Sequence, residues 1–351
     1  MQYKELSRKL EKRSELLVES TMQCIYKDKR DDIKETEREK KSINDLKYIL
    51  NYLSEAVYFN KKEIFNDFSD WLKTLFINIG LGEQVFTDTY NCLQKVIFSE
   101  FNQEISNYLI KIIEDAKNSA IEKQEWGKSY IKEDNPYYEY AKQYLKLLLD
   151  HKKSQASKLI TEEAFLNMEV DEIYLKIFQP VQKEVGRLWH KNEVSVAQEH
   201  YISSVTQLIM SQLYAHFLSI GGKKGSLVTT AVGNELHEIG IRMIADLFEV
   251  DGYDTIHLGA NTPNNSIIET LRNNHSKLLG ISVTLPIHLQ ELEKLINMIK
   301  NAEGLQELKI MVGGYAFNRN PSLLDKFDID LYCKDASEAV NKANELMKGV
   351  N

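Results

Sequence analysis

The chain has 351 residues, 43% of them hydrophobic and 27% charged, a composition that is ordinary for a soluble globular protein of two or three domains. Its formal net charge of -8 argues against broad nucleic-acid binding through a basic surface. No stretch approaches the roughly 20 apolar residues of a membrane span, and the first residues form no apolar signal core, so we expect a cytoplasmic protein without membrane contact.

Residues 1–125 are predicted to form a helical domain. Apolar residues recur at helical spacing over Leu46–Val57 and again over Ile64–Leu75. The run Lys27–Lys41 mixes both charge signs and is predicted to be a solvated helix face or a linker. All eight histidines lie within residues 151–288, so no local histidine can bind a cofactor in this first domain.

Two further domains are predicted downstream. A polar stretch from 125 to 136 carries Gly and Pro and ends the first domain. Residues 137–220 again show helical spacing, over a length that suits a four-helix bundle, and Gly221–Gly225 then breaks the chain. Over residues 225–351 strand and helix signals alternate, which predicts an α/β domain with a doubly wound, five-stranded parallel sheet. Its strands are expected at Leu227–Val232, Thr255–Leu258, Leu278–Val283, Lys309–Val312 and around Leu331.

The three cysteines are Cys24, Cys92 and Cys333, and they form no CxxC pair or other spacing typical of a metal site. We therefore expect reduced thiols, as in a cytoplasmic protein.

The segment Glu235-Leu236-His237-Glu238-Ile239-Gly240 lies between the first predicted strand and the helix that follows it. In open α/β sheets, ligands bind at this position, beyond the carboxyl ends of the strands. An imidazole beside a carboxylate can coordinate a ligand, with Glu235 or Glu238 orienting its second nitrogen. The alternative is a surface histidine on a βα loop. The sequence shows no dinucleotide, P-loop, zincin or nucleophile-elbow motif at this position.

Glu235-x-His237-x-x-Gly240 resembles the D/ExHxxG signature of cobalamin-binding domains, and Ser282-Val283-Thr284 and Val312-Gly313-Gly314 fall where that family has its tail-binding segments. The resemblance implies a Rossmann-like fold in which His237 is the lower axial ligand of cobalt. It also implies a channel for the nucleotide tail, lined by Ser282, Thr284, Gly313 and Gly314. Glu235 is one methylene longer than the Asp that many members carry, and it is expected to hydrogen-bond His237.

Upstream, Trp189 and His190 are followed by Glu199-His200, and this Wx9EH pattern resembles the light-sensing adenosylcobalamin domains of the CarH type. The resemblance implies that the helical bundle caps the corrin. Trp189, Val196, Glu199 and His200 would then enclose the adenosyl group. His190 would bind cobalt after photolysis. Taken singly, Trp189 is an ordinary core or rim aromatic, and His190 and His200 are surface residues.

The N-terminal helical domain resembles the globin-like sensor domains that precede cobalamin modules in some bacterial photoreceptors, among them the photocobilins. That resemblance implies a second chromophore, biliverdin or another bilin. The alternative is a helical dimerisation domain without a chromophore. No MerR-type helix-turn-helix is present, so direct DNA binding is not expected.

The sequence is therefore interpreted as a light sensor and not an enzyme. It is expected to bind adenosylcobalamin base-off with His237 on cobalt, and to signal through its cap and its homodimer contacts to an unidentified partner. The alternatives are a corrinoid methyl-carrier protein of a methyltransferase system and a light-independent cobalamin sensor.

Overall fold

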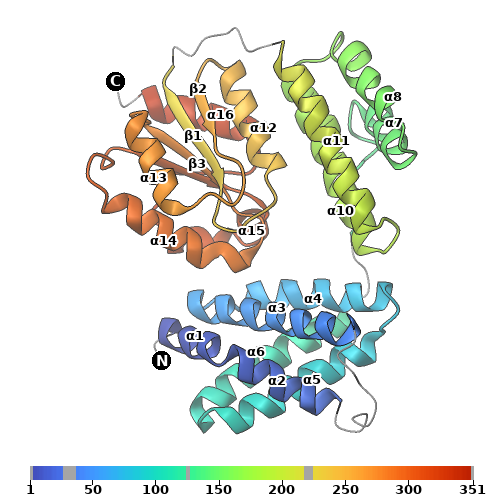
Figure 1. The fold of residues 1–351 in the computed structure, drawn as a ribbon, viewed down its shortest axis with the longest axis vertical. Coiled ribbons are helices and arrows are strands. Elements are labelled where there is room, and N and C mark those ends of the chain that lie inside the picture. The colour runs from blue at the N-terminus through green and yellow to red at the C-terminus, as the bar shows by residue number, and fades with distance from the viewer. Residues whose placement is uncertain (1–2, 27–36, 124–126, 217–223, 349–351) are drawn as a thin grey trace. The chain divides into compact units, whose positions relative to one another are not determined.

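The computed structural model describes residues 3–26, 37–123, 127–216 and 224–348 (Figure 1). Most of the charged run Lys27–Lys41, most of the break at Gly221–Gly225 and part of the polar boundary after residue 123 lie outside these ranges. Among the residues that are described, no helix has the length and hydrophobicity of a membrane span.

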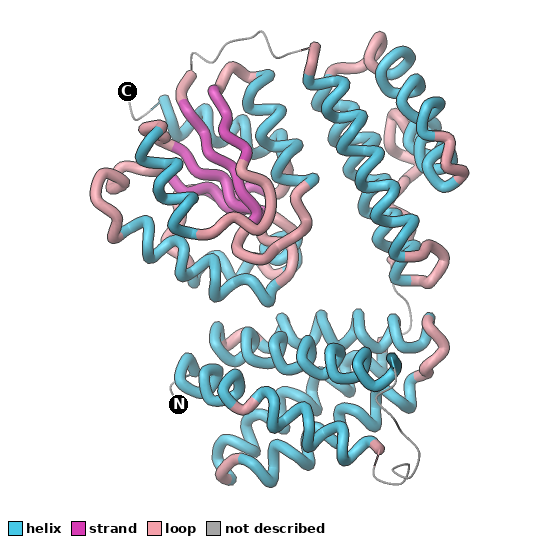
Figure 2. Tube along the Cα trace, viewed as in Figure 1, coloured by secondary structure: helices cyan, strands magenta, loops and turns pink. Residues whose placement is uncertain are grey.

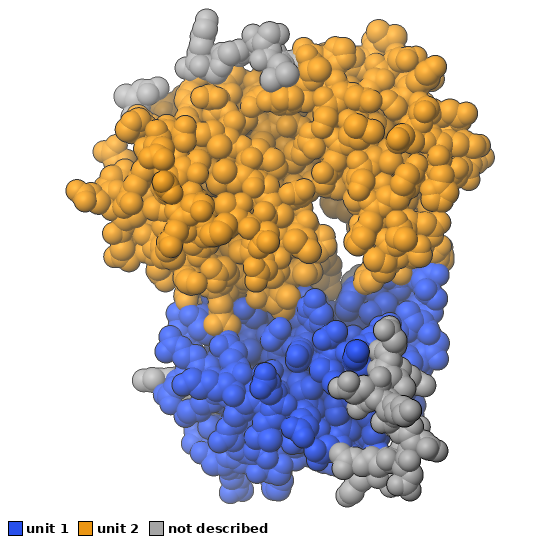
Figure 3. All heavy atoms as spheres, viewed as in Figure 1, with its two compact units in different colours: residues 1–127, 190–192 blue, residues 128–189, 193–351 orange. Residues whose placement is uncertain are grey.

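The chain divides into two compact units (Figure 3). Unit 1 comprises residues 1–127 together with His190–Asn192, and unit 2 comprises residues 128–189 and 193–351. The three residues 190–192 therefore belong with the N-terminal helices although they are far from them in sequence.

Unit 1 is helical throughout its described residues, as predicted. Its core is built from apolar side chains that the helical spacing places on inward faces, among them Leu53, Phe65 and Leu93, which are fully buried. Tyr90 is also fully buried, and its hydroxyl donates to Ser69 Oγ at 2.7 Å. The helices are α1 (Tyr3–Lys12), α2 (Ser14–Ile25), α3 (Glu37–Phe59), α4 (Lys62–Asn78), α5 (Glu83–Glu100) and α6 (Gln103–Glu122).

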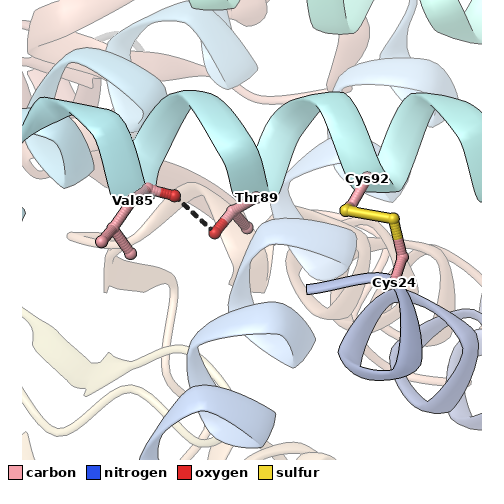
Figure 4. Close-up of a disulfide and its surroundings, with 4 residues drawn as sticks. All are labelled: Cys24, Val85, Thr89 and Cys92. Carbon is pink, nitrogen blue, oxygen red and sulfur yellow. Dashed lines mark hydrogen bonds between the residues drawn. A yellow bond between two sulfur atoms is a disulfide. The ribbon is translucent and has the colours of Figure 1, made fainter. Parts of the chain in front are cut away.

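A disulfide joins Cys24 of α2 to Cys92 of α5, so the prediction that all cysteines are reduced thiols is wrong (Figure 4). The two residues are 68 apart in sequence, and only the packing of α2 against α5 brings them together. On α5, one turn before Cys92, Thr89 donates to the carbonyl of Val85 at 2.8 Å (Figure 4). Cys333, in unit 2, is a buried free thiol.

Unit 2 begins with a bundle of four helical rods, and we call this bundle the cap. Its core includes Tyr144, Phe178, Ile202 and Ile209, all fully buried. The second and third rods each contain a π-helical turn within an otherwise α-helical stretch. The rods are α7 (Tyr138–Leu149), α8 (Lys153–Lys158) with η1 (Leu159–Ala164), α9 (Val170–Glu172) with η2 (Ile173–Phe178) and α10 (Gln179–His190), and α11 (Val196–Tyr214).

The remainder of unit 2 is a five-stranded parallel sheet in the order β2-β1-β3-β4-β5, which confirms the predicted doubly wound fold (Figure 2). Helices α12 and α16 cover one face, and α13 and α14 cover the other (Figure 1). The strands are β1 (Ser226–Ala231), β2 (Asp254–His257), β3 (Leu278–Ser282), β4 (Lys309–Gly313) and β5 (Leu331–Cys333), and the helices are α12 (Ile239–Val250), α13 (Asn264–Asn273), η3 (Pro286–His288), α14 (Leu289–Lys300), α15 (Tyr315–Arg319), η4 (Pro321–Lys326) and α16 (Ala336–Lys348).

Helix α12 joins the sheet to the cap. Met243 and Leu247 pack into the apolar core of the cap. Between them in sequence, Asp246 is buried and accepts a hydrogen bond of 2.7 Å from the hydroxyl of Tyr174, a cap residue. Burial raises the pKa of Asp246 to about 6, although Tyr174 and Arg242 oppose the shift. The contact between α12 and the cap therefore contains a buried carboxyl group whose ionised form is unfavourable.

We predict that Asp246 makes unit 2 less stable as the pH rises. Since its pKa is about 6 in the folded state against an ordinary 3.8, the folded state binds the proton more tightly. The free energy of unfolding should fall by up to about 3 kcal/mol between pH 4 and pH 7 from this group. Asp246→Asn should abolish that part of the pH dependence and be more stable than wild type at pH 7, measured by thermal unfolding. Equal pH profiles for the two proteins would contradict the prediction.

Candidate functional site

A buried carboxylate anchors the loop between β1 and α12. Glu235 is fully buried, and its Oε1 accepts from the ring Nδ1 of His237 at 2.5 Å and from the backbone N–H of His237 at 3.1 Å. Its Oε2 accepts from the backbone N–H groups of Thr284 at 3.0 Å and Leu285 at 2.8 Å, directly after β3. The predicted hydrogen bond between Glu235 and His237 is therefore present, and Glu235, not Glu238, orients the ring.

The electrostatics of this pair follow from its hydrogen bonds. Burial alone raises the pKa of Glu235, but the hydrogen bond and charge of His237 and the N–H of Leu285 outweigh it and lower the pKa to about 2. The hydrogen bond to Glu235 raises the pKa of His237 against the opposing effect of burial, and the charges of Glu235 and Glu199 add to the rise. The carboxylate is thus ionised at neutral pH and holds a proton on Nδ1.

The other ring nitrogen of His237 is presented outward. The side chain is 59% exposed, and no hydrogen bond to Nε2 is found in the described ranges. Because Nδ1 carries the proton toward Glu235, Nε2 is the atom that can bind a metal. No group of three or more His, Cys, Asp or Glu side chains that could hold a metal occurs among the described residues. His237 Nε2 is therefore an outward-facing nitrogen that could bind a metal.

Gly240 lies in the first turn of α12, three residues after His237. A Cβ at this position would meet nothing within 4 Å, so the protein's own packing gives no reason for glycine. Glycine inside a helix costs up to about 1 kcal/mol relative to alanine. Gly240 is exposed, and its surface is open to a ligand.

The ends of β3 and β4 lie side by side, with Ser282 paired in register with Gly313. The two glycines at the end of β4, Gly313 and Gly314, are required by the protein's own backbone. A Cβ at Gly313 would lie 2.8 Å from the carbonyl oxygen of Cys333, and one at Gly314, where φ is 106°, would lie 2.3 Å from that of Val283. The close backbone approach expected here is thus made by neighbouring strands and loops, and whether a nucleotide tail also runs past Ser282, Thr284, Gly313 and Gly314 stays a prediction.

The cap presents several predicted site residues around the start of α11. Val196 is 52% exposed and His200 is 74% exposed, while Trp189, at the end of α10, is half-buried. Glu199 Oε2 lies 2.5 Å from Nδ1 of His200. The charge of Glu199 contributes to the raised pKa of His237, so the two side chains lie near enough to interact electrostatically. Their roles toward a cofactor stay a prediction.

His190 is held within unit 1. Its Nε2 donates to the carbonyl of Trp71 at 2.8 Å, and its ring stacks on that of Trp71 with centroids 5.2 Å apart. Asn78 donates to the carbonyl of His190 at 3.0 Å. Burial lowers the pKa of His190, which favours the neutral ring. His190 is therefore not a surface residue, and its Nε2 is bonded to Trp71 within unit 1.

The backbone N–H groups that bind the carboxylate of Glu235 could not be predicted from the sequence. The N–H groups of Thr284 and Leu285 carry no signal, because every residue except proline has such a group. Glu238 was considered only as a partner of His237. In the structure its carboxylate accepts from the N–H of Ala260 at 3.0 Å and from Gln207 of α11 at 3.3 Å.

Comparison with known proteins agrees with this geometry. Residues 225–342 match the model of a B12 binding domain, and residues 140–214 match a second model that is also described as a B12 binding domain. The two matches support cobalamin binding and identify the sheet as a Rossmann-like B12-binding domain. Residues 1–127 lie outside both matches.

Individual relatives are corrinoid proteins. Dimethylamine corrinoid protein 1 of Methanosarcina mazei is 31% identical over 128 residues, which are 36% of this chain and 58% of that protein. This chain thus covers less than two thirds of that relative. Dimethylamine corrinoid protein 3 of Methanosarcina acetivorans is 27% identical over 188 residues, which are 53% of this chain and 87% of the relative. The solved structure of the Methanosarcina barkeri monomethylamine corrinoid protein shares the fold, with a TM-score of 0.53 at 18% identity over 60% of this chain and 99% of that one.

These comparisons overturn the light-sensor interpretation. The relatives are methylamine corrinoid proteins, and nothing in their names or in the matched models points to a CarH-type photoreceptor, an adenosyl ligand or a bilin. The Wx9EH spacing was misleading because it does not determine what each side chain contacts, and His190 bonds to the carbonyl of Trp71 within unit 1. The comparisons do not support the homodimer or the signalling partner that were expected with that interpretation.

We predict that Gly314→Ala destabilises unit 2 strongly, because the new Cβ overlaps the backbone of Val283 in addition to the strain of a positive φ. Gly304→Ala is the matched control, since Gly304 also has a positive φ, of 83°, but open space around it. The control should cost about 1–2 kcal/mol and Gly314→Ala clearly more, measured as free energies of unfolding. Equal losses in the two variants would refute the steric explanation.

We predict that His190→Ala lowers the free energy of unfolding of unit 1 by about 1–3 kcal/mol, because a buried hydrogen bond and a stacked ring are lost. Corrinoid affinity should stay unchanged. His200→Ala, which removes an exposed ring, should leave stability unchanged. Thermal unfolding and cobalamin titration measure both. A His190→Ala protein that is fully stable but binds corrinoid more weakly would show that the residue serves the cofactor after all.

Proposed function

We propose that this protein is a corrinoid carrier of a methyltransferase system, a proposal supported by its similarity to proteins named dimethylamine corrinoid proteins. The observation that carries the proposal is the buried Glu235 that orients His237 with Nε2 outward, inside a domain that matches B12-binding domains. A bound corrinoid would supply a cobalt atom that can take up a methyl group and release it.

The protein's own residues would bind and shield that cofactor. His237 Nε2 would bind the cobalt, and Glu235 would keep the imidazole in the required tautomer. Ser282, Thr284, Gly313 and Gly314 would border the nucleotide tail. Binding of cobalt by Nε2 requires that nitrogen to be unprotonated, so cobalt would compete with a second proton for it, while Glu235 keeps the first proton on Nδ1.

The cap residues Trp189, Val196, Glu199 and His200 would face the other side of the corrinoid. A carrier does not catalyse methyl transfer by itself, so we propose methyltransferases as partners, one to load the methyl group and one to remove it. Methylated amines are the first substrate class to test, because they are named in the relatives.

The test uses the full-length protein reconstituted with cobalamin. His237→Ala should weaken cobalamin binding by roughly 10–100-fold and remove the imidazole nitrogen coupling from the electron paramagnetic resonance spectrum of the Co(II) state. His275→Asn is the matched control, because His275 is exposed and has a positive φ of 48° that asparagine tolerates. Unchanged nitrogen coupling in His237→Ala would refute the assignment of the axial ligand.

Carrier activity needs a second measurement. The reconstituted, reduced protein is mixed with dimethylamine and an amine methyltransferase, and methylation of the cofactor is followed by absorption. Transfer onward to a thiol by a second methyltransferase completes the assay. Tight cobalamin binding without methylation from dimethylamine, monomethylamine or trimethylamine would count against an amine carrier, and would favour the light-independent cobalamin sensor.

A further inference from the structure

A continuous chain of hydrogen bonds runs through the cap to Glu199. The hydroxyl of Tyr144 on α7 lies 3.0 Å from Thr206 Oγ1 on α11, and Gln182 on α10 donates to the same oxygen at 2.8 Å. The hydroxyl of Ser203 has one proton to share between two acceptors, Gln182 Oε1 at 3.2 Å and Glu199 Oε1 at 2.9 Å. Three of the four rods of the cap contribute to the chain, and it ends on a carboxylate.

The hydroxyl groups of this hydrogen-bond chain carry a desolvation cost in the core of the bundle. Tyr144 and Thr206 are fully buried among apolar residues. Burying a hydroxyl is unfavourable unless it is hydrogen-bonded, and Phe and Val would fill the same two positions without that demand. The hydrogen bonds fix side-chain orientation, because each one restricts the rotamer of the next side chain. The end of the chain that is not buried in the core is Glu199, whose orientation is set by Ser203 at Oε1 and by Nδ1 of His200 at Oε2.

The carboxylate of Glu199 lies on the face of α11 that is turned toward the His237 loop. Glu199, Ser203 and Gln207 are spaced at intervals of four and share one helix face. Gln207 donates to Glu238, the residue next to His237, at 3.3 Å. Glu199 is eight residues away from Gln207, about 12 Å along the helix. The influence of Glu199 on the pKa of His237 agrees with this placement.

We propose that Ser203 and Gln182 are positioning residues that hold Glu199 as a fixed negative charge toward the bound corrinoid, so that the cap stabilises the more oxidised states of its cobalt. The proposal rests on the proposed function, because it assigns a regulatory property to the same site. Each one-electron reduction removes one positive charge from the cobalt centre. A fixed carboxylate nearby favours the more positive state, and it does so more strongly in a site shielded from water.

The experiment measures the midpoint potential of the cobalt in holoprotein by titration with Ti(III) citrate, followed by absorption. Glu199→Gln keeps the size and removes the charge, and it should favour the reduced state about tenfold, which is 59 mV for one electron. Ser203→Ala keeps the charge and releases the carboxylate, so it should shift the potential in the same direction by less. Glu163→Gln removes an exposed charge from the same bundle and should leave the potential unchanged.

An unchanged potential in Glu199→Gln would overturn the proposal. So would loss of cobalamin binding by a folded Glu199→Gln protein, because Glu199 would then be a binding contact. A shift in Glu199→Gln with none in Ser203→Ala would refute the positioning role of the hydrogen-bond chain. The potential is measured on any bound corrinoid, without methyltransferases, so a failure of methyl transfer is told apart from a failure of this proposal.

Discussion

The candidate site depends on the buried carboxylate of Glu235. A buried anion without donors costs several kcal/mol, and here four N–H groups meet its two oxygens. Two of them come from the loop after β1 and two from the end of β3, so one side chain ties together two loops at the carboxyl edge of the sheet. The same bonds decide the chemistry of His237. They place the proton on Nδ1, fix the ring, and leave Nε2 as the free ligand.

Buried polar groups also order the rest of unit 2. Asp246 and Tyr174 join the sheet to the cap, and the chain from Tyr144 to Glu199 crosses the cap itself. Apolar packing around Met243 and Leu247 stabilises the contact but does little to fix the orientation of side chains. Hydrogen bonds between buried groups fix side-chain orientation, because a buried polar group without a partner raises the free energy of the folded state. The positions of the side chains around His237 therefore follow from a few specific bonds laid over an ordinary apolar core.

The prediction of function failed where it relied on spacing alone. Trp189, His190, Glu199 and His200 stand at intervals typical of a light-sensing cap, but intervals do not say what each ring contacts. His190 is stacked on Trp71 and bonded to its carbonyl, a partner 119 residues away in sequence. The signature around His237 correctly predicted the hydrogen bond from Glu235 and a B12-binding domain, because its imidazole, carboxylate and glycine are local and need only the strand, loop and helix nearby.

The sequence by itself determined the alternation of strands and helices, the five parallel strands, the four-helix cap and the place of His237 at the carboxyl edge of the sheet. These follow from hydrophobic periodicity and from short loops, which are local properties. Only the tertiary structure decided that Glu235 is held by Thr284 and Leu285, that Cys24 pairs with Cys92, that His190 belongs to unit 1, and that Glu199 ends a hydrogen-bond chain. Each of these joins residues far apart in the chain, and such partners are selected by packing, which no local pattern encodes.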